Sequence, residues 1–175
     1  PKEFLNALHF AHEKQCDVII STGAVSAGEF DFVKKSLEVI GTDILYHKIK
    51  LRPGKPNLFA KLSSGILYFG LPGNPVSTAV GLRMFVFHAI KSMLGQQPEI
   101  PFKSKINHDF TKKYNLHGIL KAKYQHTDEG YLLVNIMHGQ DSFMVNPFLE
   151  MNCWVSLPET KLSVAIGETV DTFPL

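Results

Sequence analysis

Residues 17–28 of the chain read DVIISTGAVSAG, an apolar, β-branched run followed directly by a loop of small residues. The run at 17–21 is bounded by turn-forming residues and is typical of a buried strand. Apolar residues recur at helical spacing before this run and again from about 31 to 40, where Gly41 ends the pattern. The order helix, strand, glycine loop, helix predicts a layered α/β domain.

The pattern downstream extends this domain as far as Gly95. Strands are predicted at 44–51, 58–62 and 66–71, where short apolar runs are separated by turn residues. A long apolar helix is predicted from about 76 to 94. Because it is apolar on most of its faces, we expect this helix to be largely buried.

The stretch QQPEIP at 96–101 is the best candidate for a domain boundary. No good helix pattern follows it, and short strands are predicted at 118–125, 131–137, 153–157 and 168–173. We therefore expect an α/β domain at 1–95, a linker at 96–101 and a small all-β domain, barrel or sandwich, at 102–175.

Composition excludes several classes of protein. The 175 residues carry a net charge of +2 and are 45% hydrophobic, so the chain is not intrinsically disordered. No apolar run is long enough to span a membrane, and the balanced charge gives no sign of nucleic-acid binding. Two cysteines fit a reducing compartment. Since the chain starts at Pro1, within an apparent helix, we expect it to be a piece of a longer protein.

The loop at 23–28 is the first candidate for chemistry. Backbone N–H groups between a strand and a helix form an anion site, although a plain tight connection explains the loop equally well. Asp31 follows the loop, where a carboxylate would repel a bound anion. It fits if a divalent metal bridges it to a phosphate or if it positions a reacting group. An ordinary first-turn aspartate explains it equally well, and Glu29 is the nearby competitor for such a role.

Lys48, Arg52 and Lys55 form the second candidate, a cationic group around a turn stiffened by prolines. Such a group suits an oxyanion or a phosphoryl ligand, and a solvated basic turn is the alternative.

The third candidate is the stretch GLPGNPVS at 70–77, directly before the predicted long helix. Pro72 and Pro75 restrict the backbone, while Gly73 leaves one position free. We expect this loop to present the start of a helix, with Ser77 able to cap it or to donate to a ligand.

Three segments together resemble the signatures of the MoeA/gephyrin E-domain family, the molybdopterin molybdenumtransferases, in order and at the right separation. They are residues 17–34, 52–56 and 71–77, and a weaker likeness continues at 165–170. The resemblance implies a three-layer α/β/α molybdopterin-binding domain, N-terminally incomplete, followed by a small β-barrel domain. It also implies that the parent protein has four domains and forms a homodimer in the cytoplasm.

The resemblance further implies an enzyme of molybdenum cofactor biosynthesis, which inserts molybdate into adenylylated molybdopterin and releases AMP with the help of Mg²⁺. The catalytic residues would be Asp31, which is also the candidate Mg²⁺ ligand, Lys48, Arg52, Pro72 and Pro75. The substrate-binding residues would be Gly23, Ser26, Gly28, Lys55, Gly73, Asn74, Ser77, Lys121 and Ser142. We expect this piece to be inactive on its own and to self-associate.

The chain departs from the family pattern in four segments. Ala24 replaces a second glycine of the loop, Arg52 a lysine, Lys121 an arginine, and Asn146-Pro147 part of a serine-rich ligand loop. Ala24 and Asn146-Pro147 motivate an alternative, a non-catalytic scaffold or molybdopterin-binding module that retains the fold. A related enzyme of nucleotide metabolism is a weaker alternative, because the segment at 71–75 and the trailing β domain argue against it.

Overall fold

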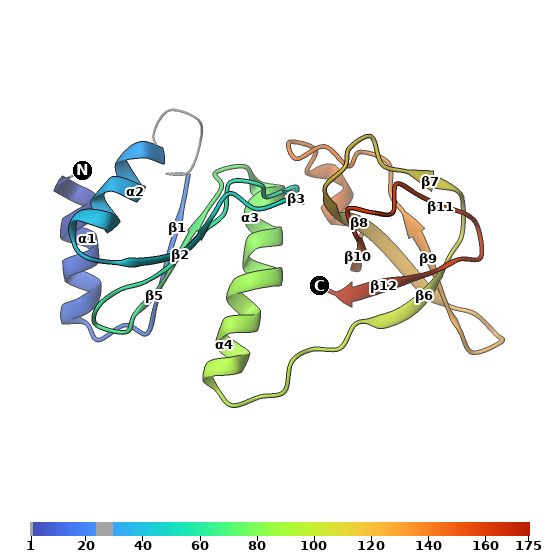
Figure 1. Ribbon diagram of the computed structural model, residues 1–175. Helices are drawn as coiled ribbons and strands as arrows, with labels where there is room; N and C mark the ends of the chain where they lie inside the picture. The colour runs from blue at the N-terminus through green and yellow to red at the C-terminus, as the bar shows by residue number, and fades with distance from the viewer. Residues whose placement is uncertain (1, 24–29) are drawn as a thin grey trace. The chain divides into compact units, whose positions relative to one another are not determined.

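The structure is a computed structural model that describes residues 2–23 and 30–175, apart from the side chains of Phe30 and Asp31 (Figure 1). The chain divides into two compact units. Unit 1 comprises Pro1–Ile49 and Gly54–Leu82, and unit 2 comprises Lys50–Pro53 and Arg83–Leu175. Unit 2 thus includes residues 83–95 as well as the linker expected at 96–101, and the domain limits inferred from the sequence stay a prediction.

Unit 1 is built on a four-stranded sheet of order β1-β5-β4-β2. The neighbouring strands β1 and β5 run parallel, and the pairs β5–β4 and β4–β2 are antiparallel. The strands are β1 (Val18–Thr22), β2 (Asp43–His47), β4 (Leu58–Lys61) and β5 (Leu67–Leu71).

The prediction of one strand over 44–51 is wrong beyond His47. Lys48 has φ of 62°, a left-handed conformation that turns the chain out of the sheet. The next strand, β3 (Leu51–Arg52), pairs instead with a strand of unit 2.

Helices cover both faces of the sheet in unit 1, as the expected three-layer architecture requires (Figure 1). One face packs against α1 (Lys2–Glu13) and α2 (Phe30–Val39), where Val33 and Leu37 are completely buried. Each such side chain contributes about 1.5–3 kcal/mol through its removal from water. The opposite face carries Phe69 and Leu71 and packs against α3 (Pro75–Gly81).

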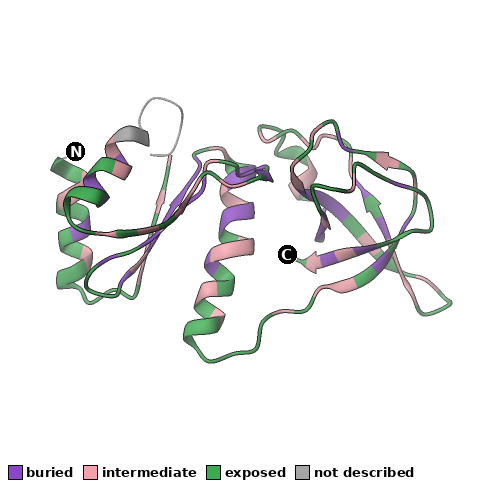
Figure 2. Cartoon of the chain, viewed as in Figure 1, coloured by how far each residue is buried: buried purple, intermediate pink, exposed green. Residues whose placement is uncertain are grey.

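The predicted long helix is present, but it is not uniform. It consists of α3, a π-helical turn η1 (Leu82–Val86) and α4 (Phe87–Met93), and it ends at Gly95 with φ of 69°. The expectation that the helix is largely buried is wrong for α4, which contains no buried residue (Figure 2). Within the described residues, no helix is both long and apolar enough to cross a membrane.

Unit 2 contains a closed five-stranded barrel in which β8 pairs with both β9 and β10, as the sequence predicted for the β domain. The sequence pattern predicted the limits of four barrel strands to within two residues and missed the first barrel strand, β6. The barrel strands are β6 (Phe102–Ile106), β8 (His117–His126), β9 (Leu132–Ile136), β10 (Cys153–Leu157) and β12 (Thr169–Pro174). A small ribbon of β7 (Phe110–Thr111) and β11 (Ser163–Val164) and a short 3₁₀ helix η2 (Asn146–Leu149) complete the unit.

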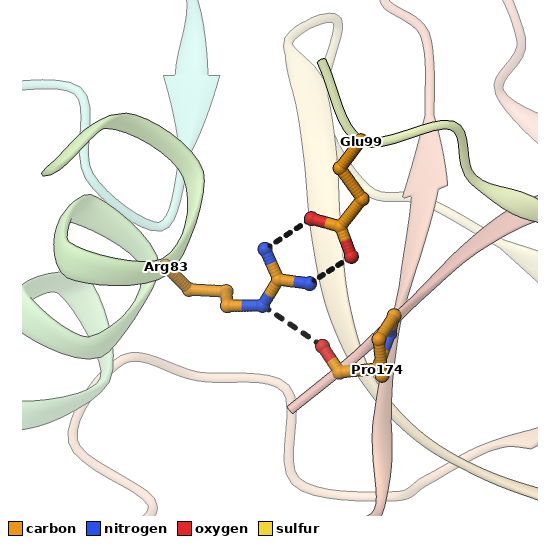
Figure 3. A network of polar contacts seen from close by, with 3 residues as sticks. All are labelled: Arg83, Glu99 and Pro174. Atoms are coloured by element: carbon orange, nitrogen blue, oxygen red, sulfur yellow. Dashed lines mark hydrogen bonds and ion pairs between the residues drawn. The ribbon is translucent and has the colours of Figure 1, made fainter. Parts of the chain in front are cut away.

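Arg83 joins three segments of unit 2 (Figure 3). Its guanidinium donates to both carboxylate oxygens of Glu99, at 2.8 and 2.7 Å, and its Nε donates to the Pro174 carbonyl at 2.9 Å. These bonds hold the pKa of the Glu99 carboxyl below its usual value. Arg83 thereby ties the helix to the linker and to the last barrel strand.

Candidate functional site

The parallel strands β1 and β5 bring two of the candidate loops together. Thr22 lies opposite Leu71, so both strands end at the same edge of the sheet. The Gly23 N–H donates to the Leu71 carbonyl at 3.3 Å, and a Cβ built on Gly73 would lie 2.9 Å from the Gly23 Cα. Ligands of α/β sheets bind outside the carboxyl ends of the strands, which is where these loops begin.

The segment before α3 is fixed by its own polar groups. Asn74 is the N-cap, because its Oδ1 accepts a hydrogen bond from the Val76 N–H at 3.2 Å. The Thr78 hydroxyl donates to the carbonyls of Pro72 and Asn74. The expectation that Ser77 could cap the helix is wrong, since Asn74 does so.

Accessibility separates the residues of this segment into two groups. Pro72 and Ser77 are buried, so they shape the loop from beneath. Gly73 and Pro75 are exposed and Asn74 is partly exposed, so these three can touch a ligand.

Part of the glycine loop lies outside the described residues. Ala24, Ser26 and Gly28 belong to that stretch, and Asp31 is placed only by its backbone, in the first turn of α2. The roles expected of Ser26, Gly28 and Asp31 therefore stay predictions. Among the described side chains, no group of three or more histidine, cysteine or acidic residues could hold a metal ion.

The basic turn presents two lysines from a tightly bonded backbone in unit 1. The Lys48 N–H donates to the Asn57 carbonyl at 3.0 Å, and the Ile49 N–H donates to the Lys55 carbonyl at 2.8 Å. The side chains of Lys48 and Lys55 are exposed. Two exposed cations on a hydrogen-bonded backbone suit an anionic ligand.

Arg52 belongs to unit 2, where it lies against the barrel. Its guanidinium is centred 4.7 Å from the ring of Tyr114, and its Nη2 lies 3.6 Å from Oδ1 of Asp141. These three residues line a cleft of about 460 Å³ together with His108, His138 and Met144. An arginine beside an aromatic ring in a cleft of this size can bind an anion attached to a planar ring.

Lys121 is buried beneath the loop that carries Asp141 and Ser142. Its Nζ donates to the carbonyls of Asp141 at 3.2 Å and Met144 at 2.8 Å, and burial lowers the pKa of its ammonium. The side-chain amide of Gln140 accepts a hydrogen bond from the Lys121 N–H and donates one to the Lys121 carbonyl. In this geometry Lys121 supports the loop, and a direct contact with substrate stays a prediction, as does the role of the partly exposed Ser142.

Sequence reasoning missed Asn57, Tyr114 and Asp141. Tyr114 and Asp141 meet Arg52 from segments far away in the chain, so no local spacing marks them. Asn57 directly follows the basic turn, and an asparagine after a Gly-Lys-Pro run is a turn signal that could have been noticed.

Residues 1–92 match the family described as a probable molybdopterin binding domain. The chain belongs to this family. The molybdopterin-binding match covers β1, β5 and both loops at the edge of the sheet. It confirms the resemblance inferred from the three sequence motifs.

Curated relatives extend the likeness into the barrel. The molybdopterin molybdenumtransferase of Haemophilus influenzae is 34% identical over 167 residues, which is 94% of this chain and 41% of that protein. The proteins of the same name from Staphylococcus aureus Mu50 and Bacillus subtilis 168 are 32% and 33% identical over 89% and 90% of this chain, and 37% and 36% of their own lengths. The chain therefore spans about two fifths of the relatives' length.

Solved structures share the fold. The crystal structure of the molybdopterin biosynthesis moeA protein from Pyrococcus horikoshii OT3 aligns with a TM-score of 0.72 at 23% identity, over 97% of this chain and 38% of that one. A second Pyrococcus moeA crystal structure aligns with a TM-score of 0.71 at 25% identity, over 97% and 40%. The expected molybdopterin-binding domain followed by a β domain is thus confirmed as the fold class.

Proposed function

We propose that the protein containing this chain inserts molybdate into adenylylated molybdopterin and releases AMP, in molybdenum cofactor biosynthesis. The approach of Gly73 to Gly23 carries this proposal, because it joins two family motifs at the edge of the sheet where ligands bind. The names of the curated relatives support the same reaction.

The geometry suits two anionic substrates. The exposed Gly73 allows a phosphate or a pterin ring to approach the backbone closely. Lys48 and Lys55 supply positive charge in unit 1, and Arg52 supplies it in the unit 2 cleft. The chain would act mainly by positioning its substrates and by neutralising charge that develops in the transition state.

Asp31 is the proposed ligand of Mg²⁺. Magnesium is commonly held by one or two carboxylates together with substrate phosphates and water, so one aspartate after an anion loop is a sufficient protein contribution. When bound, the ion would neutralise phosphate charge. Pro72 and Pro75 would keep the neighbouring loop in one conformation, and Ser26 and Gly28 would contact the phosphates. We further propose, on the resemblance, a homodimer in the cytoplasm.

A binding module without activity is the second candidate, favoured by one observation. Asn146 and Pro147 open the 3₁₀ helix η2, where the resemblance leads us to expect serines. A loop altered at this position could retain molybdopterin and lose the transfer.

Rescue of cells that lack the transferase separates the two candidates. The intact protein containing this chain should restore molybdoenzyme activity, and calorimetry should show that it binds AMP and molybdopterin. Binding without rescue would favour the binding module. The absence of both binding and rescue would refute the proposal.

A further inference from the structure

Asn57 is buried at the base of the basic turn, although the lysines around it are exposed. Only 1% of its surface is accessible to solvent. Its N–H and its Nδ2 both donate to the Gly54 carbonyl, at 3.1 and 2.5 Å, and its own carbonyl accepts from the Lys48 N–H at 3.0 Å. One residue therefore closes the turn from both ends.

The other side-chain atom of Asn57 points toward α3. Its Oδ1 is buried, and within the described residues no group donates a hydrogen bond to it. A Cβ built on Gly81 would lie 2.8 Å from this oxygen and 2.7 Å from Cδ2 of Leu71. Only a glycine at position 81 lets the helix approach the turn and β5 this closely.

An unpaired buried amide oxygen is unusual in a folded protein and calls for an explanation. Stability alone does not provide one, because a residue without this carbonyl would avoid its desolvation. The feature that Asn57 does secure is the placement of Lys48, whose φ of 62° is uncommon for a residue other than glycine. The Lys48 N–H donates to the backbone carbonyl of Asn57, and the Asn57 side chain fixes that part of the turn by donating to the Gly54 carbonyl.

We propose that Asn57 is a positioning residue, which locks the Lys48–Lys55 turn against α3 at Gly81. The same helix begins at the loop of residues 72–74, which meets Gly23. Asn57 thus makes the basic turn and the ligand loop one rigid frame within unit 1. That the frame receives an anion rests on the proposed function.

The test compares four variants of the intact protein. Asn57→Ala removes both side-chain contacts, and Asn57→Asp keeps the size but loses the donor to Gly54 at neutral pH. Gly81→Ala presses on the oxygen from the helix. Asn152→Ala is the matched control, because Asn152 also bridges backbone groups through its amide, those of Tyr124 in the barrel.

Two quantities are measured, amide hydrogen exchange and the affinity for AMP by calorimetry. In the three variants at positions 57 and 81, the Lys48 and Ile49 amides should exchange about ten-fold faster than in the wild type. AMP should bind about ten-fold more weakly. The control should change neither quantity by more than about two-fold.

Several outcomes would overturn the proposal. Unchanged exchange at Lys48 and Ile49 would show that Asn57 does not hold the turn. Faster exchange with unchanged AMP affinity would show that it serves only the fold. If Asn57→Ala does not fold, the Gly81→Ala variant, which keeps the Asn57 side chain, answers the question. If the wild type does not bind AMP, the proposed function fails, and the exchange rates still test whether Asn57 holds the turn.

Discussion

The backbone of Gly73 lies against that of Gly23, so closely that a Cβ on Gly73 would sit 2.9 Å from the Gly23 Cα. The atom in the way belongs to the backbone, which cannot rotate aside as a side chain can. Substitution at Gly73 must therefore separate the two loops at the edge of the sheet.

We predict that Gly73→Ala weakens binding of AMP and molybdopterin by about ten-fold or more, because the loops move apart. Calorimetry with the intact protein measures this. Gly41→Ala is the control, since Gly41 has φ of 71° and open space around it. It should cost about 1 kcal/mol of stability and leave the affinity unchanged. Equal affinity of Gly73→Ala and the wild type would refute the role of the loop contact.

The Arg83 network should stabilise unit 2. Arg83→Ala removes the bonds to Glu99 and to the Pro174 carbonyl, so we expect a loss of about 1.5–3 kcal/mol in urea unfolding. The exposed ion pair of Lys103 with Asp171 provides the comparison. Lys103→Ala should cost less than about 1 kcal/mol. Similar losses for the two variants would show that the Arg83 network contributes no more than a surface pair.

The same network predicts a pH dependence. Because the folded-state pKa of Glu99 lies below its unfolded value, its contribution to stability is present above the unfolded pKa. This contribution is lost as the pH falls through the folded pKa. Asn or Gln at this position cannot titrate, so Glu99→Gln should lose less stability than the wild type between about pH 5 and pH 3. Parallel curves for the two proteins, measured by urea unfolding, would contradict the assignment.

Arg52 should recognise an anion through its guanidinium rather than through charge alone. We expect Arg52→Ala to weaken AMP binding by about ten-fold or more, and Arg52→Lys to recover only part of it, since lysine cannot stack on Tyr114 in the same way. Arg83→Lys is the control for the same type of substitution in unit 2, because Arg83 does not line the Arg52 cleft. It should leave the affinity for AMP unchanged. Full recovery by Arg52→Lys would show that only the positive charge matters.

Much of the fold could be predicted from local pattern. The β-branched run at 17–21 and the small-residue loop after it indicated β1 and the helix that follows, and the limits of β10 were predicted to the residue. The break at Lys48 was not, because hydrophobic pattern carries no sign of a left-handed residue other than glycine. The exposed face of α4 was also missed, since composition does not say what covers a helix.

The candidate site was predictable where motifs are local. The two loops that meet at Gly23 and Gly73 were both identified, and their contact follows from the parallel pairing of β1 with β5. The surroundings of Arg52 and the anchoring of Asn57 at Gly81 depend on contacts between distant segments, which spacing along the chain cannot reveal.

AMP is the product of the proposed reaction that can be measured without ambiguity. The intact protein containing this chain is mixed with adenylylated molybdopterin, and AMP is measured with and without molybdate. We predict molybdate-dependent release of AMP, which Asp31→Ala abolishes and Glu38→Ala, a change on the exposed side of the same helix, leaves intact. No release from the wild type, or full release from Asp31→Ala, would contradict the account.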